Sequence, residues 1–555
     1  RSSFSSSERE REREDISIKM DTSSSHEKNV SRFFGPHVRV VARSCTGRST
    51  LCVDLTKKNE TESLFVVLNR PRISRCQEHN STLSRIDTST TKRKKKIDPS
   101  RILFARSSLK SNDPKPLTNA FRKAWSGEAS YTTAASTFGR FERFGRRVIS
   151  IVAFSNVNAI ETSKGLVLID TALAVTQPIV FRALPKGKPL THLIYTHGHR
   201  DHAWFGPEFR KKSIECLEMT GQHTQVIAHR ATSERFDRYR LTSGYNGIIN
   251  KRQFQSKKSG FSKKLMDELR YPDMTYDKTM KLSIHDEVDL VLHHVKGETD
   301  DCTIVHVPSE HCCFVGDVFI WSMPNVGNPQ KVQRYPLEWC EALRFLVTLD
   351  CDMLFPGHGP PILGRERIRR ACLETASFLE KLVKPCLRMI NSGFTLNEIQ
   401  HMMECPEWNP KTQIFLQQNY DDWRFVIVNV WRLYAGSWDQ DPAHLLPPDE
   451  AKLARVVSKL AGGSDALIKM ASELRRQGEL KLATSLCQWA AHVAPRDKFV
   501  HELRASVYEE RAENEPTLMA QSIFYDAAEQ SNRVLRRGET WVRSLGARHM
   551  SENRL

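Results

Sequence analysis

Apolar residues in the first half of the chain recur in short runs that end in polar clusters. Residues 146–172 (RRVISIVAFSNVNAIETSKGLVLIDTA) predict two or three β-strands, separated by Asn and Lys-Gly turns. Residues 288–319 repeat the pattern as strand, Gly turn, strand, Pro turn and strand. The segment between these two stretches has helical and loop character. The patterning therefore predicts a mixed α/β region whose strands carry polar side chains at their ends.

The pattern changes after a Gly-Pro-Pro turn. Residues 365–393 place apolar side chains at three- to four-residue spacing and end in Asn-Ser-Gly, which predicts a helix and its stop. Thr395 and Glu398 have the spacing of a capping box that opens the next helix. Later helices follow on either side of a glycine and after a proline. We expect an all-α domain over residues 366–545, preceded by an α/β domain over residues 116–365.

Residues 1–115 differ from both regions in composition. They are rich in Ser, Arg, Lys and Thr, and they include the block TKRKKK at residues 91–96. Of the net charge of +18, this segment carries +11, with 25 Lys and Arg against 14 Asp and Glu, which leaves +7 for the rest. We expect a disordered basic leader. The modest charge of the remaining chain argues against a nucleic-acid partner.

Two further features bear on the compartment. No run approaches the roughly 18 consecutive apolar residues of a membrane span, so stable membrane insertion is not expected. The 13 cysteines include no C-x-x-C pair, and several lie in apolar surroundings typical of reduced thiols. No secretory signal peptide is recognisable. We expect a reducing compartment, the cytoplasm, and the alternative is the mitochondrion, because RFFGPHVRVVARS is similar to part of a presequence.

The stretch LIYTHGHRDHAWFG carries the densest candidate chemistry. It places four metal-ligating side chains after an apolar run: His197, His199, Asp201 and His202. In an extended segment residues at i and i+2 face the same way, so the first two histidines can hold one metal together. The aspartate and the third histidine can then face a second metal. Imidazole with carboxylate suits zinc, so the sequence predicts a zinc-class site that other segments must complete.

These residues resemble the signature of the metallo-β-lactamase superfamily. Four other segments are similar to that family in the same order: GLVLIDTA with Asp170, KGETDD, FVGDVF and FPGHGPP. The resemblance implies an αββα sandwich with two bound zinc ions. It implies that one ion is held by His197, His199 and Glu298, and the other by Asp201, His202 and His358. Asp317 would be shared between them.

Glu298 stands where most of the superfamily has histidine, and this resembles the alkyl sulfatase branch. The segments NYDDWRFVIVNVWRLYAGSWDQDPAHLLP and LAGGSDALIKMASELRRQGELKLATSLCQWAAHVAP resemble the alkyl sulfatase dimerisation domain. The resemblance covers about residues 116–540, and it implies a homodimer formed through the C-terminal helical domain. It also implies a small amphiphilic anion, most simply an alkyl sulfate ester, as substrate.

Departures from the branch concern the residues that would bind sulfate. Asn325 matches the family asparagine, but the expected arginine position falls near Gln330 or Lys331. Arg334 is a nearby substitute. Other candidate substrate-binding residues come from SGYNGIINKRQF, namely Tyr245 and Arg252.

The chemistry expected of such a site is hydrolysis. Two divalent ions about 3.5–4 Å apart lower the pKa of a bridging water toward 7, which makes hydroxide the expected nucleophile. Asp201 and Asp317 form the catalytic set with that hydroxide. The main alternative is an acyl hydrolase, such as a thioesterase or lactonase, on the same scaffold. A nucleic-acid-processing hydrolase and a non-catalytic binding module are further alternatives, and the complete ligand set disfavours the module.

Overall fold

The computed structural model describes residues 40–41, 50–57, 60–67, 114–128, 138–253 and 268–541. The chain divides into two units, residues 1–94 and residues 95–555. In the first unit β1 (Val40–Val41), β2 (Thr50–Lys57) and β3 (Glu60–Val67) form an antiparallel sheet in the order β1-β2-β3. Apart from residues 114 and 115, the rest of the expected leader, including TKRKKK, lies outside the described residues, so its disorder stays a prediction.

The second unit contains two sheets. The first has the strand order β10-β9-β8-β7-β6-β5-β4. Its strands are β4 (Phe141–Phe144), β5 (Val148–Ile151), β6 (Val157–Glu161), β7 (Leu166–Ile169), β8 (Leu190–Ile194), β9 (Gln225–His229) and β10 (Met274–Tyr276). The second sheet has the order β11-β12-β13-β14-β15-β16. Its strands are β11 (Thr279–Ile284), β12 (Val288–Val295), β13 (Cys302–Val307), β14 (Cys312–Gly316), β15 (Met353–Pro356) and β16 (Ile362–Leu363).

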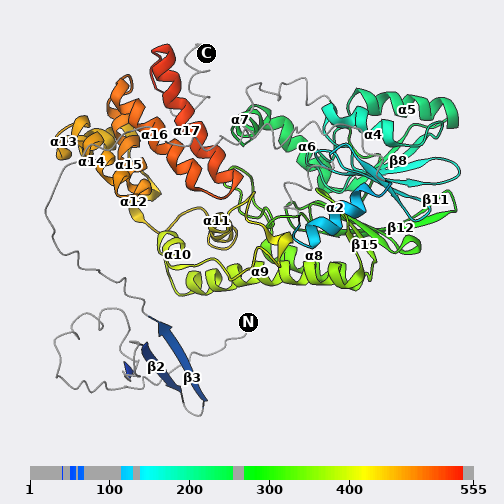
Figure 1. Cartoon of the computed structure of the whole chain (residues 1–555), viewed down its shortest axis with the longest axis horizontal. Helices are drawn as coiled ribbons and strands as arrows, with labels where there is room; N and C mark the ends of the chain where they lie inside the picture. The colour runs from blue at the N-terminus through cyan, green and yellow to red at the C-terminus, as the bar shows by residue number, and fades with distance from the viewer. Residues whose placement is uncertain are drawn as a thin grey trace, which may run out of the picture. The chain divides into compact units, whose positions relative to one another are not determined.

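Helices cover the outer faces of both sheets (Figure 1). The first sheet packs against α4 (Gln177–Ala183), α5 (Pro207–Thr220) and α6 (Ala231–Leu241). The second packs against α8 (Pro336–Thr348) and α9 (Arg365–Asn391). A separate apolar core lies between the sheets and joins residues such as Ile169 and Phe314. The predicted αββα sandwich is therefore confirmed.

Burial on two faces explains the composition of the central strands. β7 reads LVLI and β14 reads CCFVG, and every residue of both strands is buried. A strand covered on both sides takes a continuous apolar run rather than an alternating one. Polar side chains are then confined to the loops at the strand ends, which is where the predicted ligands lie.

The C-terminal region is helical, as expected. Its helices are α10 (Leu396–Met402), α11 (Trp423–Tyr434), α12 (Pro442–Leu445), α13 (Glu450–Ala461), α14 (Ser464–Arg476), α15 (Leu480–Val493), α16 (Lys498–Asn514) and α17 (Leu518–Arg537). The predicted capping box is present: the Glu398 amide donates to Thr395 Oγ1 over 3.2 Å, and the Thr395 amide donates to Glu398 Oε2 over 2.8 Å. The expected domain boundary at residue 366 falls within α9, which serves as the outer layer of the second sheet.

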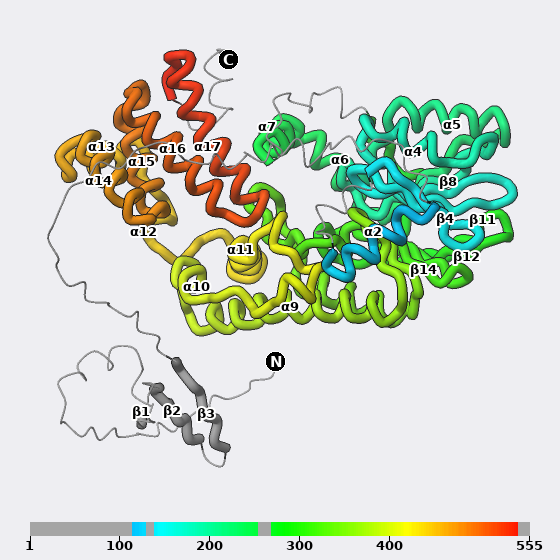
Figure 2. The backbone as a smooth tube through the Cα atoms, viewed as in Figure 1, coloured from blue at the N-terminus to red at the C-terminus, as the bar shows by residue number. Residues whose placement is uncertain are grey.

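The helical region also contacts the sandwich at a second place. Helix α17 lies beside α7 (Ser243–Gln253), which comes from the sandwich half of the chain (Figure 2). Arg252 Nε donates to Asp526 Oδ2 across this contact over 3.1 Å. Helix α2 (Pro116–Trp125) is the first element of the sandwich domain. None of the described helices combines the length and apolarity that crossing a bilayer requires.

Candidate metal centre

The predicted ligands lie in loops that follow or connect buried strands. His197, His199, Asp201 and His202 follow β8. Asp317 follows β14 directly, His358 comes two residues after β15, and Glu298 lies in the loop between β12 and β13. The two sheets therefore deliver all seven side chains to one edge of the sandwich.

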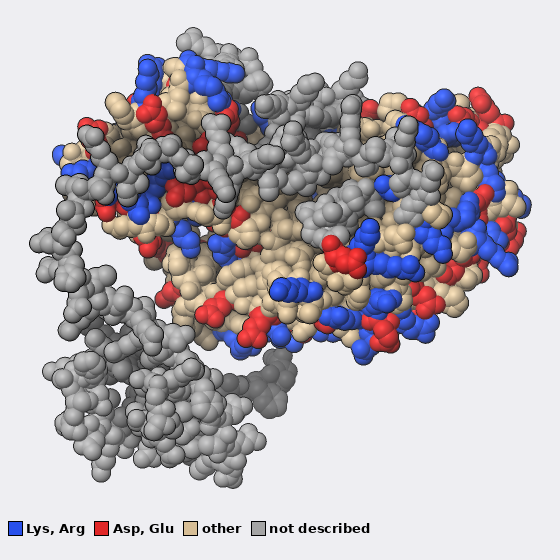
Figure 3. Space-filling view, in the orientation of Figure 1, with Lys and Arg blue, Asp and Glu red and all other residues tan. Residues whose placement is uncertain are grey.

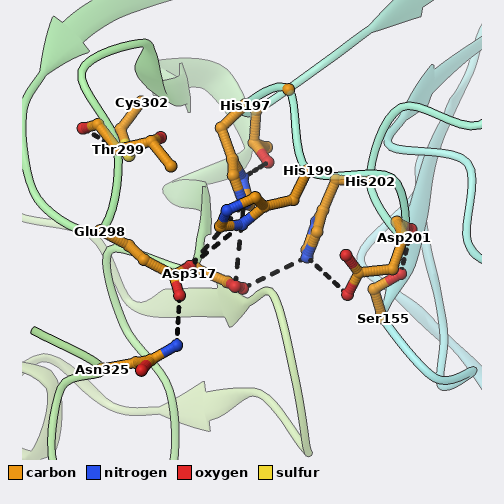
Figure 4. A network of polar contacts seen from close by, with 12 residues as sticks. Ser155, His197, His199, Asp201, His202, Glu298, Thr299, Cys302, Asp317 and Asn325 are labelled. Atoms are coloured by element: carbon orange, nitrogen blue, oxygen red, sulfur yellow. Dashed lines mark hydrogen bonds and ion pairs between the residues drawn. The ribbon is translucent and has the colours of Figure 1, made fainter. Parts of the chain in front are cut away.

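Asp317 joins two groups of donor atoms. His197, His199, Glu298 and Asp317 offer atoms within 4.8 Å of one another, and so do Asp201, His202 and His358. Asp317 Oδ2 lies 3.8 Å from His197 Nε2, whereas its Oδ1 lies 3.3 Å from His202 Nε2 (Figure 4). The same Oδ1 lies 3.4 Å from His358 Nε2. One carboxylate thus faces both groups, one oxygen to each.

Several of these buried atoms make no hydrogen bond with any residue that the structure describes. They are His202 Nε2, Glu298 Oε2 and Asp317 Oδ1. Leaving a buried polar atom unpaired costs about 1–3 kcal/mol, more where it is charged. All three atoms face the interior of the cluster, and a cation bound there would satisfy them. Imidazole nitrogens with carboxylate oxygens form the donor set of zinc-class divalent ions, so the residues fit such a group.

Hydrogen bonds on the far side of the rings fix their orientation. His202 Nδ1 lies 2.7 Å from Asp170 Oδ2, and Asp170 also accepts from the Thr196 amide over 2.7 Å. His358 Nδ1 donates to the Phe154 carbonyl oxygen over 2.7 Å. In both rings Nε2 is left facing the cluster. Such outer contacts are typical of metal-binding histidines, since they fix the tautomer and raise the basicity of the ligand nitrogen.

A buried carboxylate that sequence reasoning did not single out anchors the histidine loop. Asp301 accepts from the Gly198 amide over 2.8 Å, from Thr232 Oγ1 over 2.9 Å and from Arg235 Nε over 3.1 Å. A Cβ at Gly198 would lie 2.8 Å from Arg235 Cδ, so glycine is required between the two histidines. The only sequence signal was the second aspartate of GETDD, placed just before a buried strand.

The charges of the cluster shift its pKa values strongly. Burial alone would lower the pKa of His358, but the carboxylates of Asp317 and Asp201 raise it to about 9. The same carboxylates and Asp170 raise the pKa of His202 well above its ordinary value against burial. Burial would raise the pKa of Glu298, yet the Arg334 guanidinium holds it well below. The cluster carries enough negative charge to bind protons or cations, and bound metal ions would displace the protons.

Two family models match this chain. Residues 151–358 match the metallo-beta-lactamase superfamily, and residues 395–533 match the alkyl sulfatase dimerisation family. The first match ends at His358 and so contains all seven clustered residues. Residues 151–358 thus form a metallo-beta-lactamase-type domain. The C-terminal helices of the chain form an alkyl sulfatase-type dimerisation domain. The two matches confirm the resemblance seen in the sequence and, together with relatives named as alkylsulfatases, the expected hydrolase class.

Relatives with named activities are alkylsulfatases. A linear primary-alkylsulfatase of a Pseudomonas species is 25% identical over 363 residues, which are 62% of this chain and 68% of that protein. The alkyl/aryl-sulfatase BDS1 of Saccharomyces cerevisiae is 23% identical over 385 residues, or 64% of this chain and 58% of that protein. The stereoselective inverting sec-alkylsulfatase Pisa1 from a Pseudomonas species has a similar structure, with a TM-score of 0.63 and 19% identity, covering 76% of this chain and 70% of that one.

In this metallo-beta-lactamase fold Arg334 and Asn325 both hold Glu298. The Arg334 guanidinium pairs with Glu298 Oε1 and donates to the Asn325 carbonyl oxygen over 2.6 Å. Asn325 Nδ2 donates to the same Glu298 oxygen over 2.5 Å. The other oxygen, Oε2, lies 3.3 Å from His199 Nδ1. The two predicted substrate-binding residues therefore contact a predicted ligand, and Glu298 keeps one oxygen for the cluster.

The other predicted substrate-binding residues lie on α7. Arg252 binds Asp526 of the dimerisation domain and donates to Gln330 Oε1 over 3.0 Å. Tyr245 is 54% exposed on the same helix. The structure places Arg252 against the loop before Lys331, and in the described chain it records no contact of either residue with the seven clustered side chains.

The dimerisation domain forms hydrogen bonds with the loop that carries Asn325. Asp421, two residues before α11, accepts from the Gly327 amide over 2.6 Å and from the Asn328 amide over 3.2 Å. A Cβ at Gly327 would lie 2.4 Å from the backbone of Phe425 in α11, so the loop and the helix meet backbone to backbone. The helical domain thus supports the part of the site that holds Glu298.

Proposed function

We propose that this chain is a dinuclear zinc hydrolase that cleaves an ester of an amphiphilic anion, most simply an alkyl sulfate ester. The observation that carries the proposal is the position of Asp317, whose two oxygens face the two donor groups. Relatives named as alkylsulfatases support the choice of ester. The first group would hold one ion and the second group the other.

Each part of the site has a role in this reaction. When bound, two divalent ions lower the pKa of a shared water, so that hydroxide is available near neutral pH. Asp317 would bridge the two ligand groups, and Asp201 would complete the second group. Asp170 and Asp301 orient the histidines and their loop. Arg334 keeps Glu298 ionised, because a guanidinium beside a buried carboxylate favours its charged form.

Lys331 is the cation that we assign to the anionic head of the substrate. Burial and the neighbouring Arg334 charge lower the pKa of Lys331 to about 8, although Glu298 and Asp201 oppose the shift. The Lys331 amine is therefore mostly protonated at neutral pH, and its charge interacts with those of Glu298 and Asp201. Arg334 is already engaged by Glu298 and the Asn325 carbonyl, so its guanidinium is committed to the site itself.

The engagement of Arg334 by Glu298 and the Asn325 carbonyl also supports the second candidate, an acyl hydrolase. A thioester or lactone carries no sulfate to bind, and such a substrate does not need a free guanidinium. A nucleic-acid substrate has less support. Figure 3 shows Lys and Arg interspersed with Asp and Glu on this face, whereas a nucleic-acid-binding surface would concentrate the basic residues.

The test of the reaction is turnover by the zinc-loaded full chain on a medium-chain alkyl sulfate, a thioester and a lactone. We expect release of inorganic sulfate, a loss of roughly a thousandfold in His199→Ala, and little change in His401→Ala, an exposed histidine of α10. Lys331→Met should raise KM for the alkyl sulfate more than it lowers kcat. Acyl turnover without sulfate release would support the second candidate, and no turnover on any substrate would contradict a hydrolase.

We also propose a homodimer formed through the helical domain. On α13 three apolar side chains share one face at helical spacing and are exposed: Leu453 (42%), Val456 (58%) and Leu460 (84%). An exposed apolar face of this kind is typical of a protein interface. Light scattering of the full chain should give the mass of a dimer. Val456→Asp should give a monomer, and a dimer in both proteins would place the interface elsewhere.

A further inference from the structure

A second cluster of reactive side chains lies in the outer core of the second sheet. Cys313 Sγ on β14 lies 2.8 Å from Cys351 Sγ, which comes two residues before β15. His306 on β13 stands opposite Cys313 in the sheet register and offers a third donor atom. The proposed hydrolysis uses none of these three side chains.

The alternation of side chains along β14 selects this pair. Cys312 points into the core between the two sheets, where it packs with residues such as Phe314 and Phe355. Cys313 points to the opposite face and packs under α8 and α9, and Cys351 belongs to that same core. Adjacent residues of a strand face opposite sides of the sheet, so Cys313 rather than Cys312 meets Cys351.

The separation of the sulfurs distinguishes two kinds of site. Two thiolates on one tetrahedral zinc, each about 2.3 Å from the metal, lie about 3.7 Å apart. The 2.8 Å between Cys313 and Cys351 is shorter than this. A structural zinc site also uses four protein ligands, and among the described residues this cluster has three. The geometry therefore favours sulfur–sulfur chemistry over metal binding.

We propose that Cys313 and Cys351 are joined in a reversible disulfide when the chain meets a small peroxide. This goes beyond the proposed hydrolysis and does not depend on it. Both thiols are nearly buried, at 1% and 4% exposure, so the oxidant must be as small as hydrogen peroxide. Cys351 is the more accessible of the two and is the expected first target.

The reaction balances with two thiols and one peroxide. The Cys351 thiolate attacks one peroxide oxygen, which breaks the O–O bond, forms a sulfenic acid and releases the other oxygen as water once it is protonated. Cys313 sulfur then attacks Cys351 sulfur, the S–O bond breaks, and the hydroxyl leaves as a second water. The two cysteines lose two electrons and the peroxide gains them. Burial raises the pKa of the Cys313 thiol well above its usual value, so closure should be slow at neutral pH.

The cross-link would join two strands that lead to the metal centre. β14 ends immediately before Asp317, and the chain segment after Cys351 becomes β15, which leads to His358. A disulfide between the two strands constrains the unfolded chain and leaves the native contact in place. We expect the oxidised protein to melt a few °C higher than the reduced protein, by order of magnitude.

The test is peptide mapping of the full chain after treatment with hydrogen peroxide and alkylation under denaturing conditions. We expect a peptide pair linked through Cys313 and Cys351, two fewer alkylated cysteines, and full reversal by dithiothreitol. Cys351→Ser should lose the linked pair, whereas Cys372→Ser, a matched buried thiol of the same core, should retain it. A Cys313→Ala variant serves if the serine protein does not fold.

Three outcomes would overturn the proposal. One is a chain in which both cysteines are still alkylated after peroxide treatment, and another is a link from either residue to Cys312 or Cys372. The third is a zinc content that falls by one ion per chain in Cys351→Ser, which would identify a metal site with His306. None of these readouts uses turnover, so a failed hydrolase assay leaves this test unaffected.

Discussion

The two halves of the candidate centre are held by different parts of the molecule. Asp201, His202 and His358 are fixed within the sandwich, by Asp170, the Phe154 carbonyl and Ser155. The half that contains Glu298 is held by Arg334 and Asn325. The loop that carries Asn325 is in turn hydrogen-bonded to the dimerisation domain. The residues that support one predicted metal position therefore lie within the sandwich, whereas those that support Glu298 are themselves held by the helical domain.

The contacts that create this dependence are numerous and specific. Besides Asp421, the helical region supplies Asn419, whose Oδ1 accepts from Ser322 Oγ over 2.8 Å. Arg252 binds Asp526 on one side and Gln330 on the other, and so ties α17 to the same loop. A change in the helical domain should therefore alter the Glu298 half of the site before the other half.

The largest expected effect comes from Arg334→Met, which should affect the half that contains Glu298 and leave the other half intact. Removing one partner of a buried ion pair costs about 3–5 kcal/mol, because it leaves the other charge buried and unpaired. Arg334 and Glu298 are both nearly fully buried. We expect lower stability to urea and the loss of the ion beside Glu298, with the ion beside His202 retained. Metal content and urea denaturation measure the two effects.

A matched control is Arg344→Met. Arg344 pairs with Glu380 over 2.7 Å, but its side chain is 44% exposed, so that pair should contribute less than about 1 kcal/mol. Equal losses in the two variants would show that the effect is unrelated to Glu298. Loss of both ions in Arg334→Met would contradict the independence of the two halves.

An intermediate effect is expected from Asp170→Asn, which acts on the other half. Asp170 holds the His202 ring and the Thr196 amide, and substitution of such outer partners typically costs 10- to 100-fold in metal affinity or activity. Competition with a chelator should show weaker binding of one ion. Asp289→Asn, at an exposed position of β12, should leave both affinities unchanged. Weakening of the Glu298 ion alone would reverse our assignment of the halves.

The smallest expected effect is that of Asp421→Asn. The loop with Asn325 should loosen and kcat/KM should fall roughly tenfold, with both ions retained, since charge-assisted hydrogen bonds contribute about 1.5–3 kcal/mol each. Steady-state kinetics with metal analysis measures this. Loss of an ion would mean that the helical domain shapes the metal site itself and not only the loop.

The same variant has a pH signature. Burial raises the pKa of Asp421 to about 7, and hydrogen bonds from the Asp422 and Gly327 amides offset part of that shift. Because the folded-state pKa lies above the unfolded value of about 3.9, the stability linked to this group is complete below about pH 4 and is lost as the pH rises through 7. Wild-type stability should fall relative to Asp421→Asn between those values, as denaturation at several pH values would show. Parallel profiles would contradict the assignment.

The sequence predicted which side chains cluster better than it predicted the residues that support them, for a physical reason. Four ligands are adjacent in one loop after a strand, so local patterning was enough, and the resemblance supplied Glu298, Asp317 and His358. Asp301 and Asp421 act on amides far away in the chain, and no local pattern marks such a contact. Arg334 was expected to bind substrate, and only the folded chain shows that its guanidinium pairs with Glu298.

The most direct test of the central claim is anomalous X-ray diffraction at the zinc edge from crystals of the zinc-loaded full chain. We expect two peaks, one on each side of Asp317. One should lie beside His197, His199 and Glu298, and the other beside Asp201, His202 and His358. A single peak, or two peaks that do not share Asp317, would contradict it.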